Sequence, residues 1–179
     1  KKVKTIYKGD EAIDLNFFYY PPYINNDKGY IKSENIEDIS LNNFVIEGVA
    51  GQGKSILLRY LTYREYKNEK RIPIFIELRK LNEKSDIFNF IKESISSWVF
   101  SVSNELLSWV LKSGKIILLL DGFDELKEKD VPNVIKDLEN ISQQYPQTQI
   151  VVTSRPDNAI QSALLHKPIC KGFFSDIIS

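Results

Sequence analysis

Short apolar runs alternate with longer stretches of helical periodicity along most of the chain. The runs are rich in β-branched residues and are bounded by glycine or polar residues, which predicts strands. The stretches between them carry apolar residues three and four positions apart, which predicts amphipathic helices. The expected strands are 43–49, 72–78, 116–120, 149–153 and 167–174, and the expected helices are 54–70, 88–98, 105–111, 131–145 and a short one after Pro156. Such alternation is typical of βαβ units, so we predict an α/β fold with a parallel sheet.

The run at 116–120 is aliphatic at every position. A strand that is covered on both faces needs this composition, whereas a half-exposed strand would alternate. We therefore expect a three-layer arrangement, in which helices flank the sheet on both sides. Residues 1–42 are less regular, and we interpret them as an N-terminal leading arm rather than a separate domain, with the core at 43–179.

Aromatic residues and prolines are concentrated at 17–23. Two interpretations stay open: this segment stacks on the base of a nucleotide, or it packs against an edge of the sheet. Trp98 and Trp109 occupy apolar positions of predicted helices, so we expect both to pack, and we expect His166 on a surface turn. The chain has no methionine, even at position 1. We interpret it as part of a longer protein.

Composition excludes some partners. Lys+Arg and Asp+Glu balance at 24 each, so no overall charge attracts nucleic acid or an anionic membrane. Cys170 is the only cysteine, which rules out a disulfide within the chain. The sequence shows neither a signal-peptide pattern nor a long apolar run. We therefore expect a cytoplasmic protein.

A glycine-rich segment lies between the first predicted strand and the following helix. Residues 48–55, Gly-Val-Ala-Gly-Gln-Gly-Lys-Ser, fit the P-loop pattern G-x-x-x-x-G-K-[ST] without a mismatch. The backbone N–H groups of such a loop surround phosphate oxygens at a helix N-terminus. Lys54 would reach the β- and γ-phosphates, and the Ser55 hydroxyl would bind Mg²⁺. We expect nucleotide contacts from Gly48, Ala50, Gly51, Gln52, Gly53, Lys54, Ser55 and Ile56.

Acidic residues follow the aliphatic strand at 116–120. Asp121 comes directly after it, at the edge where ligands bind in open α/β sheets. Its carboxylate would bind Mg²⁺ opposite Ser55. Asp124 or Glu125 would polarise an attacking water, as hydrolysis requires. The sequence does not decide between these two acids.

An arginine follows the next predicted strand. Arg155 comes two residues after Thr153, and its guanidinium would contact the γ-phosphate and so report whether that phosphate is present. This side chain completes the predicted site at a third strand end.

Together these motifs resemble a NACHT domain, in the signal-transducing (STAND) branch of the P-loop ATPases. The resemblance is carried by the P-loop at 48–55, by Asp-Gly-Phe-Asp-Glu-Leu at 121–126 after its apolar strand, and by Thr-Ser-Arg-Pro at 153–156. The second strand also fits, because it ends in Glu-Leu-Arg at 77–79. The resemblance spans most of the chain, from about residue 40 to about residue 175.

The resemblance implies a function. NACHT proteins rest with ADP, exchange it for ATP on a trigger, then assemble into oligomers and activate an effector. It implies a five-stranded sheet in the order 5-1-4-3-2, Asp121 as a Mg²⁺ ligand, Asp124 or Glu125 in slow hydrolysis, and Arg155 as the sensor. It also implies innate immunity or antiviral defence, in a bacterial NLR-like protein. NACHT switches close their site with a winged-helix segment, so we expect winged-helix, sensor and effector regions elsewhere in the full-length protein.

Other P-loop classes stay open as alternatives. A kinase-like enzyme would need a pocket for an acceptor substrate, and the sequence shows no motif for one. A DNA-acting ring ATPase would generally show basic stripes, whereas this chain has no net charge. We expect ATP or ADP with Mg²⁺ as ligands, because no guanine-reading motif is present, although this does not exclude GTP.

Overall fold

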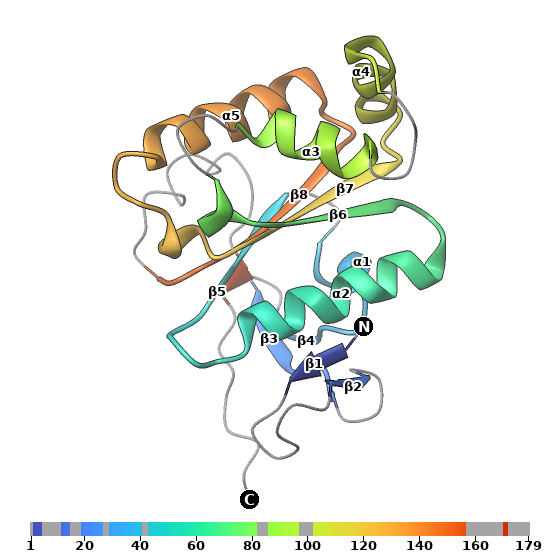
Figure 1. The fold of residues 1–179 in the computed structure, drawn as a ribbon. Coiled ribbons are helices and arrows are strands. Elements are labelled where there is room, and N and C mark those ends of the chain that lie inside the picture. Colours follow the sequence, from blue (N-terminus) through green and yellow to red (C-terminus); the bar gives the residue numbers. More distant parts are fainter. Residues whose placement is uncertain are drawn as a thin grey trace, which may run out of the picture.

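A parallel sheet in the order β6-β7-β8-β5-β9 forms the centre of the fold (Figure 1). The computed structural model describes residues 2–4, 12–14, 19–26, 29–40, 43–81, 86–96, 102–156 and 170–171. The strands are β5 (Phe44–Glu47), β6 (Ile72–Glu77), β7 (Ile116–Asp121), β8 (Gln149–Ser154) and β9 (Cys170–Lys171). All four pairings between neighbouring strands are parallel. The carboxyl ends of β5, β6, β7 and β8 therefore meet along one edge.

The predicted α/β class with a parallel sheet is confirmed. Four strands of four to six residues, β6, β7, β8 and β5, make up the body of the sheet in the order expected for them. The strand predicted at 167–174 is represented only by the two residues of β9, beside β5. The rest of that range lies outside the described residues, so a full fifth strand stays a prediction.

Helices lie on both faces of the sheet, as Figure 1 shows. One face carries α1 (Ile36–Ile39) and α2 (Lys54–Asn68). The other carries α3 (Ile87–Ser96), α4 (Asn104–Lys112) and α5 (Val131–Gln144). Within the described residues, the single-turn 3-10 helix η3 (Leu78–Lys80) directly follows β6, and another, η4 (Phe123–Glu125), follows the Asp121–Gly122 turn.

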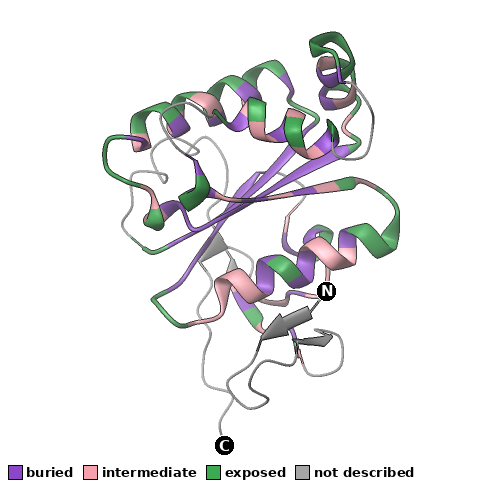
Figure 2. Ribbon diagram, in the orientation of Figure 1, coloured by how far each residue is buried: buried purple, intermediate pink, exposed green. Residues whose placement is uncertain are grey.

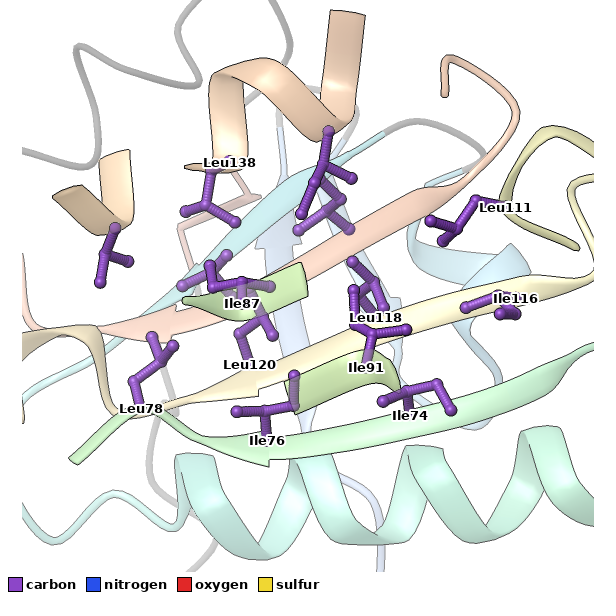
Figure 3. Close-up of a cluster of buried hydrophobic side chains, with 14 of the residues drawn as sticks. Ile74, Ile76, Leu78, Ile87, Ile91, Leu111, Ile116, Leu118, Leu120 and Leu138 are labelled. Carbon is purple, nitrogen blue, oxygen red and sulfur yellow. The ribbon is translucent and has the colours of Figure 1, made fainter. Parts of the chain in front are cut away.

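Residues of β7 alternate between two apolar clusters. Leu118 and Leu120 pack with Ile87 and Leu138 on the α3–α5 face (Figure 3). The neighbouring residues of β7 pack on the α2 face with Leu57 and Leu61. Every residue of β7 and β8 is buried, while the outer sides of the helices are exposed (Figure 2). The all-aliphatic composition of the run therefore reflects two covered faces, as expected.

The helices close to the sheet match their predicted ranges within two residues at each end. Ser103 accepts a 3.1 Å hydrogen bond from Leu106 N and so caps α4. The prediction for Trp109 is wrong, because its side chain is 67% exposed. The buried residues of α4 are Leu107 and Leu111, and a residue two positions from each of them faces the opposite side of a helix. Trp98, His166 and the helix expected after Pro156 lie outside the described residues.

The N-terminal segment is more regular than its sequence suggested. It forms two antiparallel pairs, β1 (Lys2–Lys4) with β2 (Ala12–Asp14) and β3 (Tyr23–Asn26) with β4 (Gly29–Lys32), followed by α1. Strands of three or four residues are too short to give a periodic signal. Buried side chains from β3 and α1 pack in the same cluster as α2. A domain boundary at residue 42 stays a prediction.

The aromatic segment at 17–23 contributes one ring to this cluster. Tyr19 packs against the apolar face of α2, with its ring centroid 5.1 Å from that of Tyr60. Tyr20 and Tyr23 are exposed. The packing interpretation therefore holds for Tyr19, and residues 17 and 18 lie outside the described part of the chain. Among the described helices, none is long and apolar enough to cross a membrane.

Candidate nucleotide-binding site

The loop from β5 to α2 owes its shape to two glycines. Gly51 and Gly53 have φ values of +82° and +78°, a left-handed conformation that side chains disfavour. A Cβ added at either position would meet nothing within 4 Å, so conformation rather than crowding requires glycine. Gly53 is the N-cap of α2, and its carbonyl accepts a 2.9 Å hydrogen bond from Leu57 N. The loop thus opens directly onto a helix N-terminus, where free N–H groups favour anions.

Side chains within the loop fix its ends. Lys54 Nζ donates to the carbonyl oxygens of Gly48 at 2.6 Å and Val49 at 3.1 Å. Gln52 Oε1 accepts a 2.7 Å hydrogen bond from Val49 N, and Gly48 N donates to Ser154 O at 3.3 Å. The ammonium group therefore lies inside the loop, where phosphate oxygens would compete for it.

Burial and the charges of nearby side chains shift the pKa of Lys54. Burial lowers this pKa, and this is the largest effect. The charge of Asp124 raises it and the charge of Arg155 lowers it, with smaller contributions from Asp121 and Glu125 that raise it. The loop, the acidic strand end and the arginine therefore form one electrostatic site.

Asp121 is fixed by a threonine of the neighbouring strand. Its side chain is buried, and its Oδ1 accepts a 2.8 Å hydrogen bond from Thr153 Oγ1. The same hydroxyl accepts a 2.8 Å hydrogen bond from Gly122 N. Thr153 is fully buried and therefore holds both the carboxylate and the turn that follows it.

Each of the two candidate acids after this turn has an arginine partner. Asp124 Oδ2 lies 2.7 Å from Arg155 Nε, and the Asp124 side chain is 10% exposed. Glu125 Oε2 lies 3.7 Å from a guanidinium nitrogen of Arg79, and its side chain is 49% exposed. Asp124 is thus tightly paired, whereas Glu125 is loosely paired and open to solvent.

The predicted site residues come together along one edge of the structure. Residues 48–56 line the loop and the first turn of α2, Asp121 ends β7, Asp124 and Glu125 lie in η4, and Arg155 follows β8. Their predicted roles in catalysis and ligand binding stay predictions. Thr153 was not predicted as the partner of Asp121, although Asp121 is the last residue of β7 and Thr153 is the last but one of the neighbouring β8.

The family model of the NACHT domain matches residues 42–173. This chain belongs to the NACHT domain family. It is therefore a P-loop NTPase domain, and the family implies nucleotide binding, typically with Mg²⁺. The matched range includes the loop, the acidic strand end and Arg155.

Single known proteins match this chain over only part of their own length. Ribosomal RNA small subunit methyltransferase I of Buchnera aphidicola subsp. Schizaphis graminum (strain Sg) is 33% identical in an alignment of 113 residues, and the match covers 52% of this chain and 39% of that protein. The chain thus spans about two fifths of this curated relative. A crystal structure of a DNA replication initiation factor has 17% identity and a TM-score of 0.46, over 74% of this chain and 40% of that one. The structure of C. elegans PCH-2 has 19% identity and a TM-score of 0.44, over 79% and 39%.

The residues present fit a nucleotide with Mg²⁺. Gly51 and Gly53 leave open space beside the loop, and Lys54 supplies a cation within it. Ser55 and Asp121 supply a hydroxyl and a carboxylate, the oxygen ligands that Mg²⁺ prefers. No cluster of three or more His, Cys, Asp or Glu suited to a metal occurs among the described residues. Mg²⁺ is usually held by one or two protein oxygens together with phosphate oxygens, and it would neutralise phosphate charge here.

Proposed function

We propose that this NACHT domain is the ATP- and ADP-binding module of a signal-transducing ATPase. It hydrolyses ATP slowly, and the bound nucleotide controls oligomerisation and the activation of an effector. The winged-helix, sensor and effector regions belong to the full-length protein. Family membership supports this proposal and also suggests a role in innate immunity or antiviral defence.

One observation carries the proposal. Lys54 Nζ lies inside the loop, 2.6 Å from Gly48 O, and the loop is joined to the end of β8 by the 3.3 Å hydrogen bond from Gly48 N to Ser154 O. The next residue, Arg155, pairs with Asp124 at 2.7 Å, so the loop, the acidic strand end and the arginine lie together. A phosphate-binding loop alone serves many activities, but a loop that shares its site with a Mg²⁺ carboxylate, a candidate base and an arginine suits hydrolysis of a phosphate bond. Asp121 would hold Mg²⁺ with Ser55, and Asp124 or Glu125 would orient water.

The pairing of Arg155 supports a role in sensing. In the structure Arg155 Nε lies 2.7 Å from Asp124 Oδ2. A γ-phosphate beside the loop offers a second anion to the same guanidinium, because arginine binds phosphate as well as carboxylate. Arg155 would leave or share Asp124 with ATP bound and return to it with ADP. The pairing of Arg155 at the end of β8 would therefore depend on whether the γ-phosphate is present.

Thermal unfolding tests nucleotide binding. The wild-type chain is unfolded with Mg²⁺ and ATP, ADP or GTP, beside Lys54→Ala and Lys70→Ala. A ligand at 100 times its dissociation constant adds about 2.7 kcal/mol to the stability. We expect ATP and ADP to raise the Tm of the wild type and of Lys70→Ala, whose lysine pairs with Glu37 on the exposed surface. Lys54→Ala should lose this rise. A wild-type Tm that no nucleotide changes would refute the proposal.

A further inference from the structure

An ion-pair network surrounds Glu77, the last residue of β6. In the sheet register Glu77 is paired with Asp121, so the two carboxylates end neighbouring strands at the same edge. The Glu77 side chain is 14% exposed and lies 2.8 Å from Arg59, 3.0 Å from Lys80 and 3.3 Å from Arg79. The hydrogen bond from Lys80, followed by that from Arg79, lowers the pKa of Glu77 against the opposing effect of burial. Three cations thus converge on one carboxylate beside the candidate site.

Arg79 reaches beyond this network to a second carboxylate. One of its terminal nitrogens, Nη2, lies 3.3 Å from Glu77 Oε2, and the other, Nη1, lies 3.7 Å from Glu125 Oε2. A guanidinium is planar and its N–H groups have fixed directions, so it joins two carboxylates in a defined geometry that an ammonium does not impose. Arg79 and Glu125 belong to η3 and η4, which contact each other.

Arg59 connects the same network to the phosphate-binding helix. It lies on α2, which begins at Lys54, and its guanidinium accounts for the 2.8 Å contact with Glu77 Oε1. A continuous series of ion pairs therefore runs from α2 through Glu77 and Arg79 to Glu125. Its start is the helix that begins at the predicted phosphate-binding loop, and its end is the more exposed of the two candidate bases.

We propose that Arg79 is a positioning residue for ATP hydrolysis, acting through the Glu125 carboxylate. From 3.7 Å it attracts that half-exposed carboxylate and biases it toward η3, while Arg155 pairs with Asp124 at 2.7 Å. Without Arg79, Glu125 samples other rotamers in solvent and orients water less often. This inference rests on the proposed function.

Steady-state phosphate release tests the positioning role. Wild type is compared with Arg79→Ala, Arg79→Lys and Lys80→Ala. Misplacement of a catalytic group by an ångström costs up to about 100-fold, and we expect Arg79→Ala to lower kcat by about 10- to 100-fold with KM unchanged. Arg79→Lys should recover part of this loss, since it restores the charge but not the fork. Lys80→Ala is the matched control: it removes a neighbouring exposed cation that shares Glu77, and we expect wild-type kcat.

Two further measurements separate the inference from a structural effect and from direct ligand binding. The rise in Tm with Mg²⁺ and ADP should be the same in Arg79→Ala as in wild type. In a Glu125→Gln background, Arg79→Ala should cause no additional loss of kcat, because residues that act as a unit are not additive.

The inference is overturned if Arg79→Ala keeps wild-type kcat, if it loses the ADP-dependent rise in Tm, or if its effect adds fully to that of Glu125→Gln. A wild type that binds nucleotide but releases no phosphate overturns the role of Arg79 and leaves nucleotide binding intact. A wild type whose Tm no nucleotide changes overturns the proposed function itself, and the role of Arg79 with it.

Discussion

Thr153 Oγ1 donates a 2.8 Å hydrogen bond to Asp121 Oδ1, and so connects β8 to the acidic end of β7. The same oxygen accepts from Gly122 N at 2.8 Å. All three groups are buried. One hydroxyl therefore satisfies an acceptor and a donor that water reaches poorly.

We predict that Thr153→Val destabilises the chain by about 1–3 kcal/mol, the range for leaving buried polar groups unpaired. Valine has a similar shape but no hydroxyl, so Asp121 and Gly122 both lose a partner. Urea unfolding measures the change, and Thr153→Ser, which keeps the hydroxyl, should lose less. A Thr153→Val variant within about 0.5 kcal/mol of wild type would show that the hydrogen bonds contribute little.

The role of Thr153 also marks a limit of sequence-based prediction. The placement of Asp121, Asp124 and Arg155 at one edge was predictable, because each follows an apolar run and the carboxyl ends of parallel strands meet at one edge. The hydrogen bond from Thr153 to Asp121 depends on the register between β7 and β8. Both strands are buried at every position, so neither has the alternation of apolar and polar residues that would indicate a register. The contact between Arg59 and Glu77 was likewise not predictable from the sequence, because it depends on how α2 packs against β6.

Local signals also failed where elements are short or exposed. The β3–β4 hairpin has four residues in each strand, too few for a periodic pattern. Trp109 lies in a correctly predicted helix but on its outer side, because the buried face is fixed by Leu107 and Leu111. Periodicity thus predicted the elements well and the buried side of a two-turn helix poorly.

The turn after Asp121 depends on Gly122. Its φ is +77°, and a Cβ there would come within 3.2 Å of the Glu125 side chain. We predict that Gly122→Ala lowers stability by about 1–2 kcal/mol, the cost of a left-handed conformation for a residue with a Cβ, and also lowers the rate of phosphate release. Gly114→Ala is the control. Gly114 also has a positive φ, +67°, and a Cβ there would come within 3.2 Å of Gln147, but this position precedes β7 and lies away from the site. Equal loss of turnover in both variants would assign the effect to general strain.

The lowered pKa of Lys54 predicts a pH dependence of stability. A lysine whose pKa is lower in the folded chain than in the unfolded chain binds its proton less tightly when folded, so its protonation favours unfolding. Relative to Lys54→Met, wild type should therefore gain stability as the pH rises through the window below the ordinary value of 10.5. Urea unfolding of both proteins without nucleotide, from about pH 7 to about pH 10, measures the difference, in which the titration of tyrosines largely cancels. If wild type instead lost stability relative to Lys54→Met as the pH rises, this result would contradict the burial of the ammonium.

A buried ion pair at the opposite edge of the sheet should matter more for stability than exposed ones. Glu65 is 3% exposed and accepts from two nitrogens of Arg71, at 2.8 and 3.1 Å. Breaking a buried pair by removing one charge costs about 3–5 kcal/mol, so we predict a loss of this size for Glu65→Gln. The exposed pair of Glu37 and Lys70 is the comparison, and Glu37→Gln should cost less than about 1 kcal/mol. Similar losses for the two variants would mean that burial does not increase the contribution of Glu65 to the free energy of unfolding.

The pairing of Arg155 with Asp124 leads to a prediction about nucleotide discrimination. Arg155 is 59% exposed, so its truncation removes little packing, but it leaves the Asp124 carboxylate, which is 10% exposed, without this partner. We therefore expect Arg155→Ala to fold with a loss of about 1–3 kcal/mol. Under the proposed function, the γ-phosphate is the only phosphate of the nucleotide that the guanidinium contacts. Arg155→Ala should therefore keep the rise in Tm with Mg²⁺ and ADP and lose most of any additional rise with a non-hydrolysable ATP analogue. Asp124→Asn tests the other half of the exchange: it frees Arg155 from its carboxylate, and we expect the preference for the ATP analogue over ADP to increase. If both variants discriminate between the two nucleotides as wild type does, then Arg155 and Asp124 form a structural ion pair, and γ-phosphate sensing must reside elsewhere.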